Sequence, residues 1–267
     1  MAAEQVAEPM RLAGKRAAII GAGSVGEGWG NGKATAVLFA REGARVLCVD
    51  RSADAAEATA EIIGGEGGSA ETLVADVADP EAGRMVMDRM AAAWGGIDIL
   101  DYNVGISQRG GVLETEDADW ERVFEINLTG AMRITRAVLP AMREQKGGSL
   151  IYVSSIAAVF SGPYSYVSYE VSKMGLVRFA RSVARENAAH QIRSNAILPG
   201  LIDTPHVNAF VDGDTDPAEL AAGRAAMAPM GRQGTGWDVA RAALFLASDD
   251  AAYVSGIEMK VDGALTA

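Results

Sequence analysis

Short apolar runs alternate with longer amphipathic segments along the 267-residue chain. The runs predict seven buried strands, at 15–20, 44–49, 70–75, 97–103, 149–153, 192–198 and 256–261. Apolar positions at helical spacing predict helices over 33–42, 54–63, 80–94, 115–145, 166–190 and 237–247. Because strands that alternate with helices pair in parallel, we expect an α/β fold with a doubly wound sheet and helices on both faces.

No composition break or Pro/Ser-rich linker interrupts this pattern, so the strands and helices belong to a single domain, 14–267. Residues 1–13 carry Glu4 and Glu8 and no apolar core. They are expected to form a flexible tail, and neither a signal peptide nor a membrane span. The segment 201–230 is expected to be irregular to helical. A cytoplasmic protein without a membrane partner is the expectation.

Composition and charge narrow the chemistry. The net charge is −11, which argues against a nucleic-acid partner because phosphate binding needs a basic face. The single cysteine, Cys48, lies inside an apolar run and is expected to be a buried structural thiol. One cysteine and two histidines provide neither a disulfide nor a zinc site, so no metal is expected.

A glycine-rich turn, 21–32, joins the first predicted strand to the first predicted helix. Glycines in such a turn let the backbone approach a pyrophosphate, and the helix N-terminus favours its negative charge. Either Gly26 and Gly28 or Gly30 and Gly32 can open the helix. We favour the second pair, because the segment after it continues as a helix without a further break.

An acidic residue ends the second predicted strand. Asp50 follows Gly30 by about 20 positions, the spacing at which a carboxylate binds the adenosine ribose of NAD and repels the 2′-phosphate of NADP. Arg51 could stack on adenine or pair with a phosphate, so NADP stays open. Ligands of such a sheet bind outside the carboxyl ends of its strands. These ends fall at Gly21, Asp50, Asp76, Asn103, Ser155 and Pro199.

A serine, a tyrosine and a lysine form the candidate reaction centre. Tyr169 and Lys173 are one helical turn apart, and an ammonium beside a phenol lowers the phenol's pKa from about 10. Ser155 ends the fifth strand and could hold a substrate oxygen, whereas Ser154 points the opposite way. The three groups can move a proton on or off an alcohol. Tyr166 is the rival phenol, but an acidic residue follows it one turn on.

These residues resemble the motifs of the short-chain dehydrogenase/reductase family over almost the whole chain, from Arg16 to Gly263. The motifs occur in the family's order at about its spacings: the glycine-rich turn, Asp50, Asp76-Val77, Asn103-Val104-Gly105, Asn127, Ser155, Tyr169-x-x-x-Lys173, Pro199-Gly200 and Val261-Asp262-Gly263. The resemblance implies a Rossmann fold in a single dinucleotide-binding catalytic domain.

The resemblance also implies a role for each residue. Tyr169 is expected to be the acid/base and Ser155 to hold the substrate oxygen. Lys173 is expected to lower the pKa of Tyr169 and to bind the nicotinamide ribose. Asn127 is expected to hold a water in a proton relay. The implied cofactor contacts are Gly21, Ser24, Gly30, Asn31, Gly32, Asp50, Arg51, Asp76, Val77, Asn103, Gly105, Tyr169, Lys173, Pro199, Ile202 and Thr204.

Three departures from the family's pattern reshape the expected site. Ile20 stands where the family's turn begins with Thr, and with the favoured register the turn is about five residues longer. Tyr102-Asn103 replaces the family's Asn-Asn. Ser155 precedes Tyr169 by fourteen positions, one more than is usual, so the loop between them should shape the substrate pocket differently.

The leading hypothesis is an NAD-dependent oxidoreductase that interconverts a secondary alcohol and a ketone. An NADPH-dependent ketone reductase, a dinucleotide-binding regulator without chemistry, and an epimerase or dehydratase with bound NAD are the alternatives. The small-molecule substrate is unassigned, and its candidate contacts are Ser155, Gln108, Arg109, Tyr164, Tyr166 and His206. The resemblance also implies a homotetramer, or a dimer, built from the helices 115–145 and 166–190.

Overall fold

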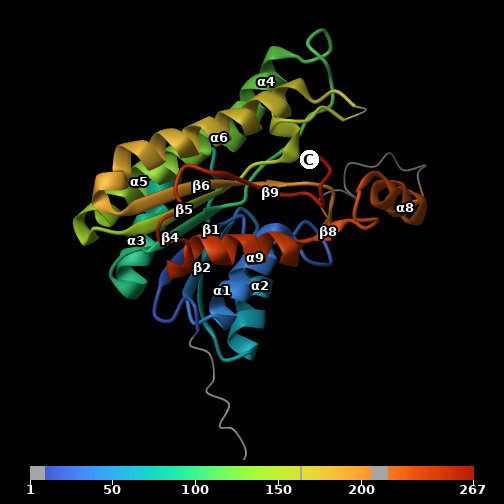
Figure 1. Cartoon of the computed structure of the whole chain (residues 1–267). Helices are drawn as coiled ribbons and strands as arrows, with labels where there is room; N and C mark the ends of the chain where they lie inside the picture. Colours follow the sequence, from blue (N-terminus) through green and yellow to red (C-terminus); the bar gives the residue numbers. More distant parts are fainter. Residues whose placement is uncertain (1–9, 163, 206–215) are drawn as a thin grey trace, which may run out of the picture.

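Seven parallel strands form the central sheet, in the order β3-β2-β1-β4-β5-β6-β9 (Figure 1). The computed structural model describes residues 10–162, 164–205 and 216–267. The strands are β1 (Arg16–Ile20), β2 (Arg45–Asp50), β3 (Ser69–Val74), β4 (Ile99–Tyr102), β5 (Gly148–Val153), β6 (Ile192–Pro199) and β9 (Glu258–Val261). Each lies within two residues of its predicted bounds, so the predicted parallel sheet is confirmed.

Helices cover both faces of the sheet, as predicted (Figure 1). One face carries α1 (Asn31–Arg41), α2 (Ala53–Gly65) and α9 (Gly236–Ala247), and the other carries α3 (Ala82–Trp94), α5 (Gly130–Gln145) and α6 (Val167–Asn187). Each layer has its own apolar core. Ile19 of β1 packs in the core with Val37 of α1, and Leu100 of β4 packs in the core with Ile134 of α5.

Burial on both faces explains why the strands read as continuous apolar runs. In β2, the residues from Val46 to Val49 are all buried. Cys48 is one of them, and burial raises the pKa of its thiol to about 12. The prediction of a buried thiol is confirmed.

The order in which strands are added to the sheet reverses between β1 and β4. The chain first adds β2 and β3 on one side of β1, and then adds β4, β5, β6 and β9 on the other side. The helices that follow β1 and β4 consequently lie on opposite faces and leave a crevice at the carboxyl ends of these strands. The candidate site residues gather at this crevice.

The predicted helix 115–145 is divided into three parts. α4 (Asp117–Phe124) passes into a π-helical segment (Glu125–Thr129), which passes into α5. A π turn is a local distortion that the spacing of apolar residues does not reveal. This turn contains Asn127, which is fully buried.

A smaller substructure extends beyond the carboxyl end of β6. β7 (Ile202–Asp203) pairs in parallel with β8 (Gly234–Thr235), and α8 (Pro217–Met227) lies between them in the sequence. Among the residues that the structure describes, no helix has the length and apolarity to cross a membrane.

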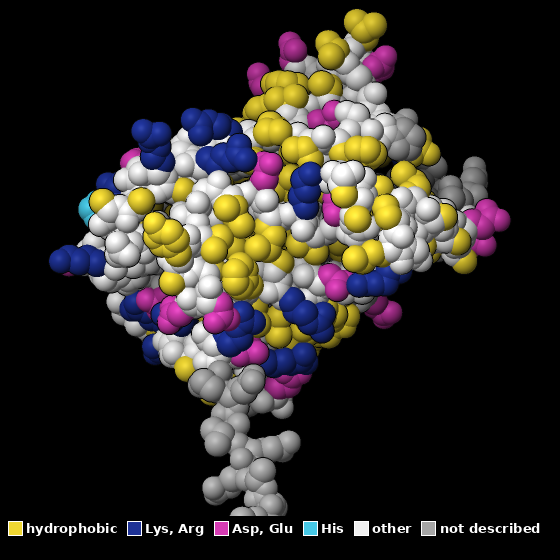
Figure 2. Space-filling view, in the orientation of Figure 1, with side chains coloured by type: hydrophobic (Ala, Val, Ile, Leu, Met, Phe, Trp, Pro, Cys, Tyr) yellow, Lys and Arg dark blue, Asp and Glu magenta, His cyan; other side chains and the backbone are white. Residues whose placement is uncertain are grey.

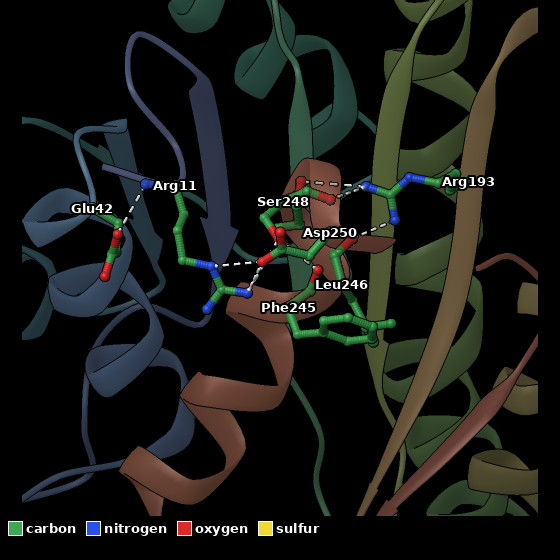
Figure 3. Close-up of polar contacts among 8 residues, drawn as sticks. Arg11, Glu42, Arg193, Phe245, Leu246, Ser248 and Asp250 are labelled. Atoms are coloured by element: carbon green, nitrogen blue, oxygen red, sulfur yellow. Dashed lines mark hydrogen bonds and ion pairs between the residues drawn. The ribbon is translucent and has the colours of Figure 1, made fainter. Parts of the chain in front are cut away.

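Residues 10–13 pack against the domain. Leu12 is fully buried, and its N–H donates to the Glu42 carbonyl. The Arg11 guanidinium donates to the Asp250 carboxylate, just beyond α9, at 2.9 Å (Figure 3). The predicted boundary of the tail at residue 13 therefore lies too late in the chain. The residues before Met10 are outside the described part.

Arg193 of β6 holds the C-terminal end of α9. Its guanidinium donates to the carbonyl groups of Leu246, Ala247 and Ser248 (Figure 3). The last carbonyls of a helix lack partners within the helix, and a cation there also balances the helix dipole. This contact fixes α9 against the sheet next to α1.

Candidate active site

A cleft of about 510 Å³ lies at the carboxyl ends of β1, β2, β4 and β5. Sites for small ligands typically measure about 300–1,000 Å³, and the crevice of a doubly wound sheet is where such ligands bind. The residues predicted to contact a cofactor line this cleft, except Pro199 and Ile202.

The glycine-rich turn closes over one end of the cleft. α1 begins at Asn31, so Gly30 and Gly32 open the helix, as the favoured register predicts. A Cβ atom on Gly32 would lie 1.9 Å from the Gly21 carbonyl oxygen, so only glycine allows this contact. Gly30 provides no side-chain cap, which leaves the first N–H groups of α1 available to a bound anion.

The Asp50 carboxylate lies beside the same turn. Its Oδ2 accepts a hydrogen bond from the Gly23 N–H at 3.0 Å, and its Oδ1 accepts one from the Ser52 N–H at 3.0 Å. The two bonds hold a negative charge in the wall of the cleft, next to Arg51.

Several polar atoms in the wall lack partners. Ser24 Oγ, Asn31 Oδ1 and Asn103 Oδ1 are buried and accept or donate no hydrogen bond among the described residues. All three residues line the cleft. Because buried polar groups in folded proteins are almost always paired, these atoms call for a polar ligand. A nicotinamide dinucleotide, with its phosphates and ribose hydroxyls, fits this donor and acceptor set and the close backbone approach at Gly32.

β5 and α6 bring Ser155 and Tyr169 together. Burial raises the pKa of Tyr169, and the nearby Ser155 hydroxyl opposes part of this rise. Ser155 Oγ also accepts a hydrogen bond from the Ala157 N–H at 3.1 Å. The rival Ser154 is buried and donates its hydroxyl to the Lys173 carbonyl at 2.8 Å. Ser155 is therefore the serine whose hydroxyl lies near the Tyr169 phenol.

Lys173 lies beside Tyr169 in the interior. Its Nζ donates to the Val153 carbonyl at 2.9 Å and lies 5.8 Å from the centre of the Tyr169 ring. Burial lowers the pKa of Lys173 to about 8. A Cβ atom on Gly105 would lie 2.7 Å from Nζ, so the glycine makes room for the ammonium. The lowered pKa of Tyr169 predicted from Lys173 is not found in this arrangement: burial raises the pKa of the phenol, and Lys173, whose own pKa is lowered to about 8, does not oppose the rise.

Asn127 ties the loop after β4 to α6. Its Oδ1 accepts from the Ile106 N–H at 2.8 Å, and its Nδ2 donates to the Ile106 carbonyl at 2.9 Å and to Ser172 Oγ at 3.0 Å. The Ser172 hydroxyl donates in turn to the Tyr169 carbonyl at 2.8 Å. Asn127 therefore fixes the turn of α6 that carries Tyr169 and Lys173. Its role in a proton relay stays a prediction.

Comparison with known proteins identifies the family. A family profile described as enoyl-(acyl carrier protein) reductase matches residues 25–266. The chain is 39% identical over 262 residues to y4mP of Sinorhizobium fredii, a short-chain type dehydrogenase/reductase, covering 96% of this chain and 99% of that protein. This chain belongs to the short-chain dehydrogenase/reductase family. It is also 35% identical over 256 residues to the 3-oxoacyl-[acyl-carrier-protein] reductase FabG of Thermotoga maritima, covering 96% and 99%.

Solved structures of short-chain dehydrogenase/reductases share the fold. A protein of Burkholderia xenovorans assigned to the family superposes with a TM-score of 0.92 at 40% identity, covering 96% of this chain and 98% of that chain. A gluconate 5-dehydrogenase from Burkholderia cenocepacia, solved with NADP and tartrate, superposes with a TM-score of 0.86 at 31% identity, covering 97% of each chain. The chain is therefore an oxidoreductase of a family that binds nicotinamide dinucleotides.

Loops form the predicted substrate side of this short-chain dehydrogenase/reductase. Arg109 Nε donates to the Tyr166 hydroxyl at 3.3 Å, and the guanidinium lies 5.1 Å from the centre of the Tyr164 ring. A backbone bridge at Tyr166 ties the loop after β4 to the start of α6. Gln108 is exposed. His206 lies outside the described residues.

The cleft wall differs from the predicted set in both directions. Ile202 packs in the apolar core with Val239 and does not line the cleft, whereas Thr204 does. Gly23 was missed, although its position two residues after Gly21 is a local signal. A Cβ atom on Gly23 would lie 2.8 Å from Asp50 Oδ2, so glycine is needed to admit the carboxylate. Other unpredicted wall residues are Ile20, Val25, Gly26, Val49, Ser52, Ala55, Ala75, Val104, Ile106, Ile126, Val153 and Ser154.

Proposed function

We propose that the protein is an NAD-dependent oxidoreductase that interconverts a secondary alcohol and a ketone. One observation carries the proposal: Tyr169 and Lys173 line the same cleft as the glycine-rich turn and Asp50, and the Ser155 hydroxyl lies near the phenol. A proton-transfer group therefore adjoins a site whose polar atoms fit a dinucleotide.

Each residue of this centre has a chemical task. Tyr169 takes the proton of the substrate hydroxyl during oxidation and returns it during reduction. Ser155 donates a hydrogen bond to the substrate oxygen and so stabilises its developing charge. Lys173 keeps a positive charge beside the phenol below about pH 8. When bound, NAD supplies the acceptor for the hydride that leaves the carbinol carbon.

The preference for NAD rests on Asp50. Its carboxylate is held by two N–H groups at the end of β2, where the adenosine ribose of a dinucleotide is expected. A fixed negative charge there repels a 2′-phosphate. The adjacent Arg51 could offset this repulsion, and one structural relative was solved with NADP. The NADPH-dependent ketone reductase is therefore the second candidate.

A screen for NADH formation tests the proposal. Polyols, sugars, hydroxy acids and cyclic alcohols are each offered with NAD and with NADP, and nicotinamide reduction is followed by absorbance. We expect at least one secondary alcohol to reduce NAD faster than NADP. The rate should rise with pH, because burial raises the pKa of Tyr169 and its base form must be populated.

Two outcomes of the screen would replace the proposal. Tight NAD binding without reduction by any alcohol would favour a non-catalytic regulator. Substrate turnover without net NADH release would favour an epimerase or dehydratase. The Ser155 and Lys173 side chains both lie near the Tyr169 phenol, and this arrangement supports an enzyme over a non-catalytic regulator.

A homotetramer or dimer in the cytoplasm completes the proposal. Exposed apolar side chains support such an assembly: Trp120 of α4 stacks on Phe124, and Val171 and Met174 of α6 are 45% and 40% exposed. Figure 2 shows hydrophobic side chains over the projecting end of the molecule that α4 and the start of α6 form. Light scattering of the purified protein should give a mass of four chains, or of two.

A further inference from the structure

A buried carboxyl group lies behind the wall of the cleft and takes no part in the proposed chemistry. Asp101 of β4 is fully buried. Its Oδ1 accepts a hydrogen bond from the Asn103 amide, and its Oδ2 has no partner among the described residues. A carboxylate buried without a cation or a full set of donors is strongly unfavourable, so this group needs an explanation.

The surroundings of Asp101 are apolar and uncharged. Its neighbours across the sheet are Ile19 of β1 and Ile151 of β5, which belong to the core beneath α1 and α9. Burial raises the pKa of Asp101 to about 8, the Asn103 amide opposes part of the rise, and no charged side chain contributes.

The acid form of the carboxyl group suits this enclosed position better than the carboxylate does. A carboxylate can only accept hydrogen bonds, whereas a carboxylic acid accepts on one oxygen and donates from the other. Oδ1 then accepts from Asn103, and Oδ2 carries the proton. The neutral form also removes the cost of burying a charge.

Asn103 connects this acid to the cleft. It follows Asp101 by two positions at the end of β4, and it lines the cleft. A Cβ atom on Gly32 would lie 3.3 Å from the Asn103 Cβ, so Asn103 abuts the turn that opens α1. The amide therefore stands between the buried acid and the expected place of the cofactor.

We propose that Asp101 is a positioning residue that keeps its own proton and holds the Asn103 amide against the cofactor cleft. The inference rests on the proposed function, because the molecule positioned is NAD. Loss of the proton would place a negative charge behind a wall that faces the pyrophosphate. Affinity for the dinucleotide then falls as Asp101 ionises.

Infrared spectroscopy tests the protonation without reference to activity. Asp101→Asn keeps the size of the side chain and cannot ionise, and Asp117→Asn, at an exposed position in α4, is the matched control. At pH 7 we expect a C=O band of a protonated carboxyl group that disappears in Asp101→Asn and persists in Asp117→Asn. Wild-type protein with ¹³C-labelled aspartate needs no variant, and its band should vanish as the pH rises through about 8. No protonated carboxyl band at pH 7 would overturn the inference.

Calorimetric titration with NAD tests the positioning role. The pKa of Asp101 is about 8, so at pH 9 about one tenth of the protein keeps Asp101 in its acid form. Because that form binds NAD, the wild-type Kd for NAD should rise about tenfold between pH 7 and pH 9. Lys173 titrates in the same range, but it is present in both proteins. The Kd of Asp101→Asn for NAD should therefore rise less between pH 7 and pH 9 than the Kd of the wild type. An equal rise in both proteins contradicts the positioning role. A wild type that binds no NAD at any pH contradicts the proposed function as well, and the infrared band still decides the protonation.

Discussion

The two sides of the active-site cleft are built by different means. On the cofactor side, backbone groups hold the site: Gly32 touches Gly21, and two N–H groups hold the Asp50 carboxylate. On the substrate side, the predicted contacts are exposed side chains on loops. Tyr164, which Arg109 contacts, is 60% exposed. The fold itself therefore dictates how a cofactor binds, and it leaves the choice of substrate to side chains that it hardly constrains.

Tyr169 lies where the two sides meet, and its loss should have the largest effect. Tyr169→Phe removes the proton-transfer group, so kcat should fall by about 10²–10⁴-fold. NAD affinity should stay unchanged, because the ring remains in place. Steady-state kinetics and calorimetric titration measure the two quantities. Tyr253→Phe, at a fully exposed position outside the cleft, is the control. Activity retained by Tyr169→Phe would refute the assigned role.

A substitution in the glycine-rich turn tests whether backbone contacts fix the cofactor side. In Gly32→Ala the new Cβ would lie 1.9 Å from the Gly21 carbonyl oxygen, so the turn must move. NAD affinity should fall by at least about tenfold, or 1.4 kcal/mol. The matched control is Gly64→Ala in α2, where a Cβ meets nothing within 4 Å. Equal NAD affinity in both variants would break the comparison between the two sides.

The Asp50 carboxylate tests the charge in the same wall. Asp50→Ala removes the repulsion of a 2′-phosphate, so the ratio of kcat/KM with NAD to kcat/KM with NADP should fall by about tenfold. Asp54→Ala, exposed in the first turn of α2, should leave the ratio unchanged. If the ratio survives in Asp50→Ala, another group sets the cofactor preference.

The smallest effect is expected on the substrate side. Contacts of exposed charged groups contribute about 0–1 kcal/mol, so Arg109→Gln should raise the substrate KM by no more than about fivefold. The rise should be largest for substrates with a carboxylate, and the KM for NAD should not change. Arg122→Gln, exposed in α4, controls for the loss of a surface cation. A raised KM for NAD would show that Arg109 belongs to the cofactor side.

The contrast between the sides also explains how far the sequence predicts this molecule. Glycines at a strand end and an acid at the end of the next strand are local signals, and they pointed to Gly32 and Asp50, which both line the cleft. The π turn around Asn127 is a local distortion that the periodicity of apolar residues does not record. Burial raises the pKa of Tyr169, whereas its spacing from Lys173 predicts a lowered pKa, and the extent of burial is known only from the folded chain.

Asp101 shows a further limit of sequence patterns. It lies inside the predicted strand 97–103, where a single carboxyl group among apolar residues leaves the strand pattern intact. Only the structure shows that its side chain is fully enclosed and that Asn103 connects it to the cleft. The substrate residues had no local signal, because exposed loop positions have no pattern that structure imposes on them.

Transfer of a deuterium from substrate to NAD tests the central claim most directly. An active secondary alcohol from the screen is prepared with deuterium on its carbinol carbon and converted by the wild-type protein. The mass of the NADH formed is then measured by mass spectrometry. We predict one deuterium in NADH for every ketone formed, and labelling that is about 10²–10⁴-fold slower with Tyr169→Phe. Conversion of the alcohol with no deuterium in NADH would contradict the assignment of this chain as an NAD-dependent alcohol oxidoreductase.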